Sequence, residues 1–208
     1  MIAGRLSQPL SRTLQGCAFL LTVLALINPA FAATPSFKCD HVESSAEKLV
    51  CKDDALAQLD WKLAQIYKDA IGKLAQDDIK TQKAIQRGWI KGRNDCWKAE
   101  NLRQCVESSY TSRITELQIM SGSIVVPKAV VFDCDENRII TAYFYNDTQI
   151  PSAVLNLNTE QSLALVSPSA SGAKYEGQNV SFWNKGREAT VNWKGQDLSC
   201  HEIPSSNE

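Results

Sequence analysis

The chain has 208 residues, of which 44% are hydrophobic, with 22 Lys and Arg against 23 Asp and Glu. This composition is typical of a globular protein of one or two domains and excludes a fibrous or disordered chain. Residues 33–208 hold 20 of these basic residues and all 23 acidic ones, a net charge of −3, so we expect no nucleic-acid partner.

The N-terminus has the pattern of a secretory signal peptide. Two arginines precede the apolar run 18–27, and the small-residue cleavage motif Ala30-Phe31-Ala32 follows it. We therefore expect residues 1–32 to be removed after Ala32 and the remaining chain to be exported, in soluble form, to the periplasm. No later segment approaches the roughly 18 apolar residues that a membrane span needs, so we expect no membrane insertion.

Cys17 lies in Leu-Gln-Gly-Cys, which is similar to a bacterial lipidation signal. In such signals the cysteine follows the apolar stretch, whereas here the apolar stretch follows Cys17, so we expect no lipid anchor. Removal of the signal leaves six cysteines, and an even number in an exported chain indicates disulfides. These six are Cys39, Cys51, Cys96, Cys105, Cys134 and Cys200.

Residues 33–120 are predicted to form a small all-α domain, because the periodicity is helical from Ser44 to about Met120. Apolar residues recur every three or four positions, which places them on one face of each helix. Asp53-Asp54 and Asp77-Asp78 stand where helices would begin, because acidic residues favour the first turn. The predicted apolar faces are Leu56, Leu59, Leu63, Ile66, Ala70 and Leu74; Ile85, Trp89 and Cys96; and Leu102, Cys105, Ile114 and Leu117.

After a linker at 121–127, residues 128–208 alternate between apolar and polar side chains. This alternation predicts seven or eight short antiparallel strands that form a small barrel or sandwich. Residues 127–208 are acidic, with six Lys and Arg against ten Asp and Glu. The alternating residues are Val130, Phe132 and Cys134; Ile140, Ala142 and Phe144; Ala153, Leu155 and Leu157; Leu163 and Leu165; Val180 and Phe182; Ala189, Val191 and Trp193; and Leu198 and Cys200.

The cysteines should tie each domain together. Cys134 on the first strand and Cys200 on the last share the alternation of the core residues, so we expect them to pair and close the barrel. The other four cysteines allow three connectivities, which the sequence leaves open. We favour the local pairs Cys39–Cys51 and Cys96–Cys105, since disulfides would stabilise helices that are marginal alone.

The chain offers little catalytic chemistry. His41 and His201 each lie close to a cysteine, but cysteines in an oxidising compartment serve in disulfides, so we expect no metal. The stretch 133–137 begins like a calcium loop but lacks the later Gly and Glu, and therefore predicts a hairpin turn. We expect no enzyme activity and no cofactor.

Two polar stretches of the second half stand out, Ser-Ala-Ser-Gly-Ala-Lys-Tyr at 169–175 and Trp-Asn-Lys-Gly at 183–186. In the simplest interpretation they are hairpin segments, in which glycines supply the turns and the lysines are solvated. Tyr175 and Trp183 would then cover the barrel.

The segment 130–200 resembles the MliC/PliC-type bacterial inhibitors of C-type lysozyme. The resemblance implies an all-β antiparallel eight-stranded barrel closed by one disulfide, in its soluble periplasmic form. C-type lysozymes are basic, so the acidic second half should favour their encounter. The matching stretches are Phe132-Asp-Cys134, Ala142–Asp147, Pro168–Tyr175, Trp183–Gly186 with Ala189, and Asp197–Cys200.

The resemblance also implies a binding site and a partner, C-type lysozyme. A loop carrying Ser171 would enter the lysozyme cleft, where Ser171 and Lys185 contact the catalytic carboxylates. Gly172 would allow close backbone approach, Tyr175 would brace the loop, and Lys174 would lie at the rim. The implied lysozyme-binding residues are Ser171, Gly172, Lys174, Tyr175, Lys185 and Gly186. The alternative is a cell-envelope binding or assembly module for peptidoglycan or another protein.

The first half resembles the N-terminal domain of LprI-like proteins, whose name-bearing member is associated with lysozyme inhibition. This resemblance implies a helical fold tied by disulfides. The charged stretch Arg87–Asp95, including Lys91 and Arg93, is interpreted as a solvated helix surface, with a binding face as the alternative. The matching stretches are Phe37-Lys-Cys39, Ala46–Cys51, Leu59-Asp60 with Leu63 and Tyr67, Gln86–Cys96, and Cys105 with Tyr110 and Ile114.

Overall fold

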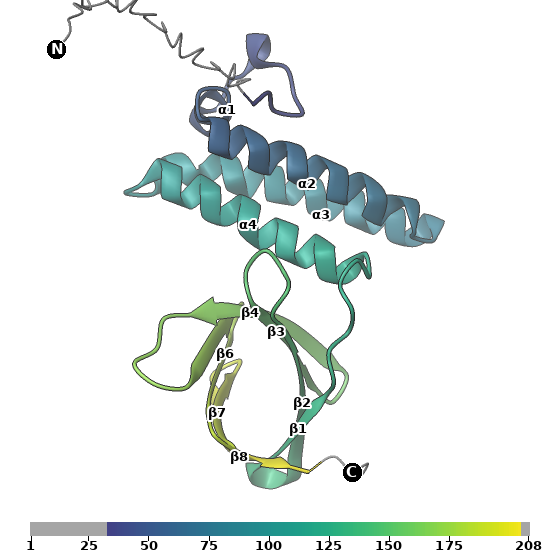
Figure 1. Cartoon of the computed structure of the whole chain (residues 1–208), viewed down its shortest axis with the longest axis vertical. Helices are drawn as coiled ribbons and strands as arrows, with labels where there is room; N and C mark the ends of the chain where they lie inside the picture. Colours follow the sequence, from purple (N-terminus) through teal and green to yellow (C-terminus); the bar gives the residue numbers. More distant parts are fainter. Residues whose placement is uncertain (1–32, 205–208) are drawn as a thin grey trace, which may run out of the picture. The chain divides into compact units, whose positions relative to one another are not determined.

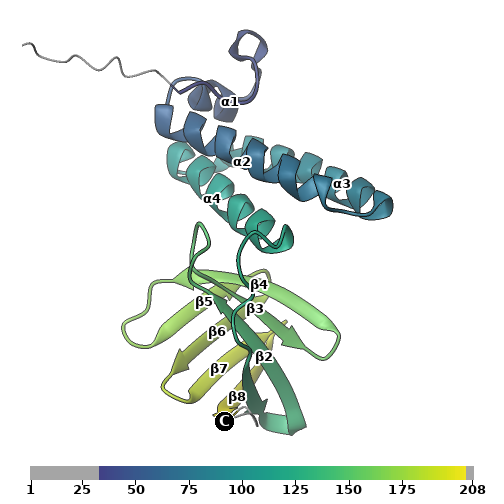
Figure 2. The same ribbon diagram turned by 45° about the vertical axis from the view of Figure 1, so that its right-hand side comes forward.

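The computed structural model describes residues 33–204, so the predicted signal peptide and Cys17 lie outside the described residues. Within these residues the helices come first in the chain and the strands follow (Figures 1 and 2). The predicted order of an all-α region and an all-β region is therefore confirmed. The helices are α1 (Ser45–Val50), α2 (Asp54–Gly72), α3 (Gln76–Asn94) and α4 (Leu102–Met120), with short 3-10 turns η1 (Cys39–His41) and η2 (Asp95–Lys98).

The helices begin at residues that satisfy their free N–H groups. Ser44 and Glu47 form a capping box at α1, in which each side chain accepts a hydrogen bond from the other residue's backbone N–H. Asp53 caps α2 by accepting from two backbone N–H groups. Helix α3 has no side-chain cap, but Asp77 and Asp78 lie in its first turn, where the helix dipole favours negative charge.

Glu47 also links α1 to α3. Its Oε1 lies 3.4 Å from Arg93 Nη2 and accepts a hydrogen bond from Asn94 Nδ2 at 3.4 Å. Burial is the largest single influence on the Glu47 carboxyl and raises its pKa, while the hydrogen bonds from Ser44 lower it. The hydrogen bond from Asn94 and the charge of Arg93 also lower it, and together with the Ser44 bonds they outweigh burial, so the pKa of Glu47 lies below its ordinary value.

A buried polar network lies in the core of the helical region. The guanidinium of Arg93 donates to the Tyr110 hydroxyl at 2.6 Å, and that hydroxyl donates to Asp60 Oδ1 at 2.8 Å. The rings of Phe37, Trp89 and Tyr110 lie 5.3 to 5.9 Å from the guanidinium carbon, within the range of cation–π attraction. Burial raises the pKa of the Tyr110 phenol, which therefore keeps its proton for Asp60. The buried charges are thus paired and hydrogen-bonded, as low-dielectric interiors require.

Two expectations for α3 are corrected by this network. Arg93 is 4% exposed, so it belongs neither to a solvated surface nor to a free binding face, whereas Lys91 is exposed. Ile85, which was expected on the buried face with Trp89, is 43% exposed. Arg93 lies one helical turn beyond Trp89 and takes the buried position, because the rings and the carboxylate of Asp60 supply it with partners.

Two disulfides tie the helical region together. Cys39 is bonded to Cys51 and Cys96 to Cys105, across 12 and 9 positions of sequence. Each bond joins a short turn to the end or start of a helix. The rest of the helical core is apolar; its buried members are Ala46, Val50, Leu56, Leu63, Ala70, Cys96, Val106, Tyr110, Ile114 and Leu117.

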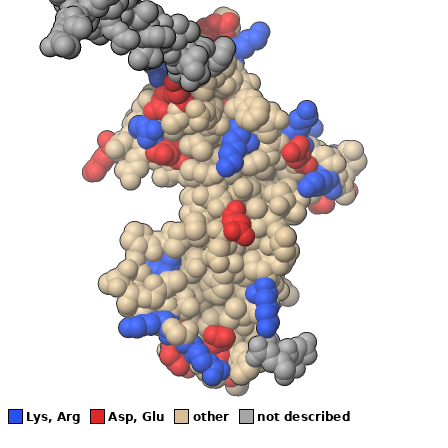
Figure 3. Space-filling view, in the orientation of Figure 1, with Lys and Arg blue, Asp and Glu red and all other residues tan. Residues whose placement is uncertain are grey.

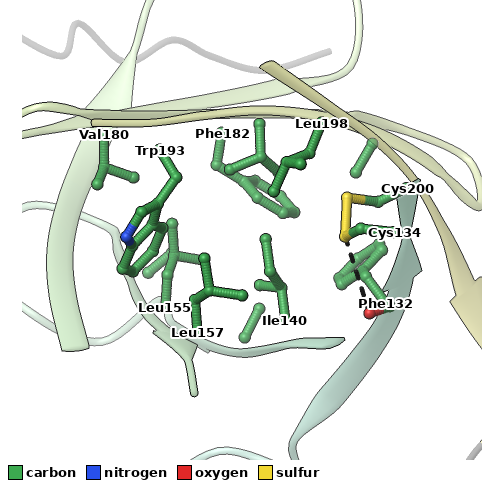
Figure 4. Close-up of a cluster of buried hydrophobic side chains, with 14 of the residues drawn as sticks. Phe132, Cys134, Ile140, Leu155, Leu157, Val180, Phe182, Trp193, Leu198 and Cys200 are labelled. Atoms are coloured by element: carbon green, nitrogen blue, oxygen red, sulfur yellow. Dashed lines mark hydrogen bonds between the residues drawn. A yellow bond between two sulfur atoms is a disulfide. The ribbon is translucent and has the colours of Figure 1, made fainter. Parts of the chain in front are cut away.

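The strands form a closed antiparallel barrel in which each strand pairs with the next and β8 pairs with β1. Closure brings Cys134 opposite Cys200, and the two form a disulfide (Figure 4). A closed sheet has no free edge that could pair with another chain. The strands are β1 (Val130–Cys134), β2 (Arg138–Tyr145), β3 (Ser152–Leu157), β4 (Glu160–Ser167), β5 (Ala173–Gly177), β6 (Val180–Lys185), β7 (Glu188–Trp193) and β8 (Gln196–Ile203), with η3 (Asp135–Asn137) between β1 and β2.

Strand alternation directs the predicted apolar residues into the barrel in every predicted strand except β4. Phe132, Ile140, Leu155 and Phe182 are at most 1% exposed and fill the interior together (Figure 4). In β4, the inward residue is Ala164, while Leu163 and Leu165 lie on the other face and stay partly exposed. The reason is register: Ala164 stands opposite Ala153 and shares its inward face.

The antiparallel order decides which connections lie together. Successive connections alternate between the two ends of the barrel, because each strand reverses the direction of the one before it. The β2–β3, β4–β5 and β6–β7 connections therefore share one end. The loop 168–172, before β5, and the turn 186–187, after β6, both lie at this end (Figure 2).

Candidate functional site

The pairing of β5 with β6 brings the two polar motifs side by side. Ala173 stands opposite Asn184, so the residue before it, Gly172, lies beside Lys185. A Cβ placed on Gly172 would lie 3.2 Å from the Cβ of Lys185. Ser171, Gly172 and Lys185 are all exposed. Residues that are more than ten positions apart in the sequence thus form one exposed end of the barrel.

The loop 168–172 is held by hydrogen bonds and not by burial. All five of its residues are exposed. The indole N–H of Trp183 donates to the Ser171 carbonyl at 2.8 Å and to the Ser169 hydroxyl at 3.2 Å. The Ser169 hydroxyl donates to the same carbonyl at 2.7 Å. The main chain of Ser171 is therefore fixed, while these bonds leave its side chain unused.

Gly172 occupies a position that only glycine fits. Its φ of +69° lies in the left-handed region, and an added Cβ would lie 2.3 Å from the Asn184 carbonyl oxygen. Gly186 has a φ of +62° in the β6–β7 turn, but nothing lies within 4 Å of its Cβ position. Gly172 thus allows close backbone approach, whereas Gly186 only supplies the turn.

Tyr175 lies inside the barrel beneath the loop. It is 7% exposed, and its ring centroid is 5.4 Å from that of Phe144 and 6.4 Å from that of Phe182. Burial raises the pKa of the Tyr175 phenol. This position suits a brace that supports the start of β5 from within.

The two lysines of the motifs have different surroundings. Lys174 Nζ lies 2.5 Å from Glu176 Oε1, and this contact is the main cause that lowers the pKa of Glu176. By contrast, no carboxylate oxygen of residues 33–204 lies within 4.0 Å of the Lys185 Nζ, so Lys185 forms no salt bridge there. Lys185 is thus an exposed lysine without a salt-bridge partner among the described residues, while Lys174 is engaged on the barrel surface.

The described residues hold no group of three or more His, Cys, Asp and Glu arranged for a metal. The calcium-like stretch 133–137 forms a turn around η3, in which Glu136 and Asn137 have positive φ. Among residues 33–204, no helix is both long and apolar enough to cross a membrane. On the face shown in Figure 3, basic and acidic side chains are interspersed without a continuous patch of one sign.

A polar hollow of about 580 Å³ opens on the outer surface of β4–β6, away from the loop 168–172. The carboxylate of Glu160 in its wall accepts hydrogen bonds from the Trp193 indole at 2.9 Å and from Lys194 at 2.7 Å. Trp193 is 4% exposed and presents almost no ring face to a ligand. The Glu160 carboxylate of this hollow is therefore already hydrogen-bonded.

The sequence of the barrel matches a known family. The model of the family described as membrane-bound lysozyme-inhibitor of c-type lysozyme matches residues 132–199, which run from β1 to β8. The resemblance predicted for the second half is thereby confirmed.

The relatives extend the resemblance to the first half. Lipoprotein LprI of Mycobacterium bovis is 29% identical over 188 residues, which cover 88% of this chain and 94% of that protein. The membrane-bound lysozyme inhibitor of C-type lysozyme from Cupriavidus necator is 33% identical over 64 residues, 31% of this chain and 51% of that protein. The crystal structure of Pseudomonas aeruginosa MliC in complex with hen egg white lysozyme is 30% identical, covering 36% of this chain and 81% of that one, with a TM-score of 0.33. The chain thus combines an LprI-like first half with an MliC-like barrel.

The sequence did not indicate the role of Trp183 as a hydrogen-bond donor. It was expected only to cover the barrel, and it does lie partly buried on the outer face of β6. The signal that could have revealed it is an indole donor beside the motif, but its acceptors lie 12 and 14 positions away and become neighbours only through strand register.

Proposed function

We propose that this chain is an exported, periplasmic protein that inhibits C-type lysozyme and has no enzyme activity of its own. The observation that carries the proposal is the convergence of Ser171 and Lys185 on one exposed end of a barrel that matches the lysozyme-inhibitor family. The names of the relatives that match the barrel support the same partner.

The chemistry of lysozyme explains why these side chains would inhibit. Glycoside hydrolysis needs one protonated carboxylic acid and one carboxylate on either side of the bond that breaks. An ammonium between the two groups makes charge-assisted hydrogen bonds and favours ionisation of the acid. Lys185 would supply the ammonium, and the Ser171 hydroxyl can bond to either carboxyl group. The cleft would be both filled and deprived of its proton donor.

The surroundings of Lys185 favour this role. Its side chain is exposed and has no acidic neighbour within salt-bridge distance in residues 33–204, so binding would not have to break an existing ion pair. The acidic balance of residues 127–208 would speed the encounter with a basic enzyme. Around these two groups, Lys174 would lie at the rim and Tyr175 would brace the loop. Gly172 and Gly186 would supply the turns.

Inhibition of hen egg white lysozyme by the purified protein tests the proposal. We expect Lys185→Ala to weaken inhibition by about 2–5 kcal/mol, the range for loss of one partner of a buried charge pair. Lys194→Ala is the matched control, because it removes the same charge from the β7–β8 turn at the other end of the barrel. Full inhibition by both Lys185→Ala and Ser171→Ala would refute the mechanism.

The alternative of an envelope module for peptidoglycan or another protein has less support. The hollow around Glu160 has no free carboxylate pair and no exposed aromatic face. Binding of peptidoglycan fragments without any binding of lysozyme would favour the alternative. A cell-wall turbidity assay with the protein alone should show no lysis.

A further inference from the structure

We propose that Trp183 is a positioning residue, whose indole N–H and the Ser169 hydroxyl together hold the loop 168–172 in the form that enters lysozyme. This inference rests on the proposed function and adds to it a residue outside the Ser171 and Lys185 pair. We call Trp183, Ser169 and the Ser171 carbonyl the loop clamp.

The loop clamp is a closed triangle of hydrogen bonds. Two donors converge on the Ser171 carbonyl, from Ser169 at 2.7 Å and from Trp183 at 2.8 Å. The third side joins the indole N–H to the Ser169 hydroxyl at 3.2 Å, so the N–H is shared between two acceptors. Because Ser169 accepts one bond and donates another, the bonds polarise and strengthen each other.

The loop needs such a clamp because it has nothing to bury. Its sequence is Pro-Ser-Ala-Ser-Gly, and all five residues are exposed. Small polar residues on a surface bring no hydrophobic energy to offset the entropy of holding one conformation. A loop that is ordered only on binding pays this cost in affinity, whereas a loop ordered beforehand does not.

Trp183 provides a rigid anchor for the clamp. It lies in β6, where its main chain stands opposite Lys174 on one side and Thr190 on the other. The preceding residue, Phe182, is fully buried in the barrel, so Trp183 faces outward, toward the loop side of β5. The indole is therefore carried by the barrel itself and does not move with the loop.

The clamp acts on the main chain next to the binding group. It fixes the carbonyl of Ser171, and Gly172 then turns the chain into β5 with its φ of +69°. The direction of the Ser171 side chain follows from that backbone. Trp183 would thus set where the Ser171 hydroxyl stands relative to Lys185.

The test replaces Trp183 with phenylalanine in the full chain. Trp183→Phe keeps an aromatic ring but removes the indole donor. Trp193→Phe is the matched control, because it makes the same chemical change in the same barrel, where the indole donates to Glu160 and not to the loop. Ser169→Ala removes the other donor with little change in volume.

Two measurements separate positioning from general stability. Hydrogen–deuterium exchange of the segment 168–173, without lysozyme, should become faster in Trp183→Phe and Ser169→Ala and stay unchanged in Trp193→Phe. Inhibition of hen egg white lysozyme should weaken about threefold to tenfold in Trp183→Phe, the value of one neutral hydrogen bond. The double variant should be little weaker than Trp183→Phe alone, because either change opens the triangle.

The outcomes distinguish this proposal from the one on which it rests. If Trp183→Phe inhibits like the unmodified protein while Lys185→Ala loses inhibition, the loop clamp is wrong and the lysozyme site stands. If Lys185→Ala and Ser171→Ala both inhibit fully, the proposed lysozyme-binding site is wrong, and the proposed role of the loop clamp in inhibition is refuted as well. If Trp183→Phe does not fold, Ser169→Ala decides: unchanged exchange and inhibition in that variant would overturn the clamp.

Discussion

Gly172 joins the exposed loop 168–172 to β5, and its replacement by alanine measures how tightly the two motifs are packed. Two costs add in Gly172→Ala. A non-glycine residue at a φ of +69° costs about 1–2 kcal/mol. The new Cβ would also lie 2.3 Å from the Asn184 carbonyl oxygen, a backbone atom that has to shift, and such overpacking costs about 1–3 kcal/mol. We expect a total loss of about 2–5 kcal/mol in the free energy of unfolding.

Gly195→Ala measures the first, backbone cost alone, so the difference between the two variants gives the second. Gly195 has a φ of +88° in the β7–β8 turn, and nothing lies within 4 Å of its Cβ position. Only the backbone cost applies there, so we expect a loss of about 1–2 kcal/mol. Urea unfolding, extrapolated to water, gives both values. Equal losses in the two variants would refute the close approach of Gly172 to Asn184.

Inhibition adds a functional measure to the same pair of variants. If the loop is displaced from Asn184, Ser171 moves with it and inhibition of lysozyme should fall by more than tenfold in Gly172→Ala. Gly195→Ala, at the other end of the barrel, should inhibit normally.

Two further predictions concern stability. The lowered pKa of Glu47 means that the folded state holds the carboxylate more tightly than the unfolded state, so this stabilisation is complete above the ordinary pKa of 4.5 and is lost as the pH falls through the lower folded value. Urea unfolding between pH 6 and about pH 3 should therefore show a smaller pH dependence in Glu47→Gln, and identical slopes would contradict this assignment. The Cys134–Cys200 bond spans 66 positions and the Cys96–Cys105 bond only 9. In the chain-entropy model, removing the first pair should cost about 4 kcal/mol and removing the second about 2.5 kcal/mol, measured on the two double-alanine variants; a larger loss for the shorter loop would count against this account.

The sequence predicted most of the secondary structure, because periodicity is a local property. Alternation identified seven of the eight strands but not β5, which lies in a stretch interpreted as a hairpin segment. Helical spacing with acidic first turns identified α2 and α3. The other predictions that failed were about which face of an element is buried. Ile85 is exposed and Leu163 lies outside the barrel, because the partner element, and not the residue's own hydrophobicity, decides which face it covers.

The candidate site divides in the same way. The motifs were enough to single out Ser171 and Lys185. Their separation in the sequence, however, gave no reason to place them side by side. Their proximity follows from the β5–β6 register, in which Ala173 stands opposite Asn184. The role of Trp183 follows from the same register and had no local signal.

The sequence alone determined three features of this protein: a helical region before a strand region, an even number of cysteines after the predicted signal, and an acidic second half. Tertiary structure decided that Arg93 is buried beside Asp60, that Ala164 faces inward, and that the indole of Trp183 reaches the carbonyl of Ser171. The physical reason is the distance along the chain over which each effect acts. Periodicity, capping and turn preferences act within one or two turns of the chain, whereas burial of a charge, strand register and a hydrogen bond across 12 positions depend on partners that only the folded chain brings near.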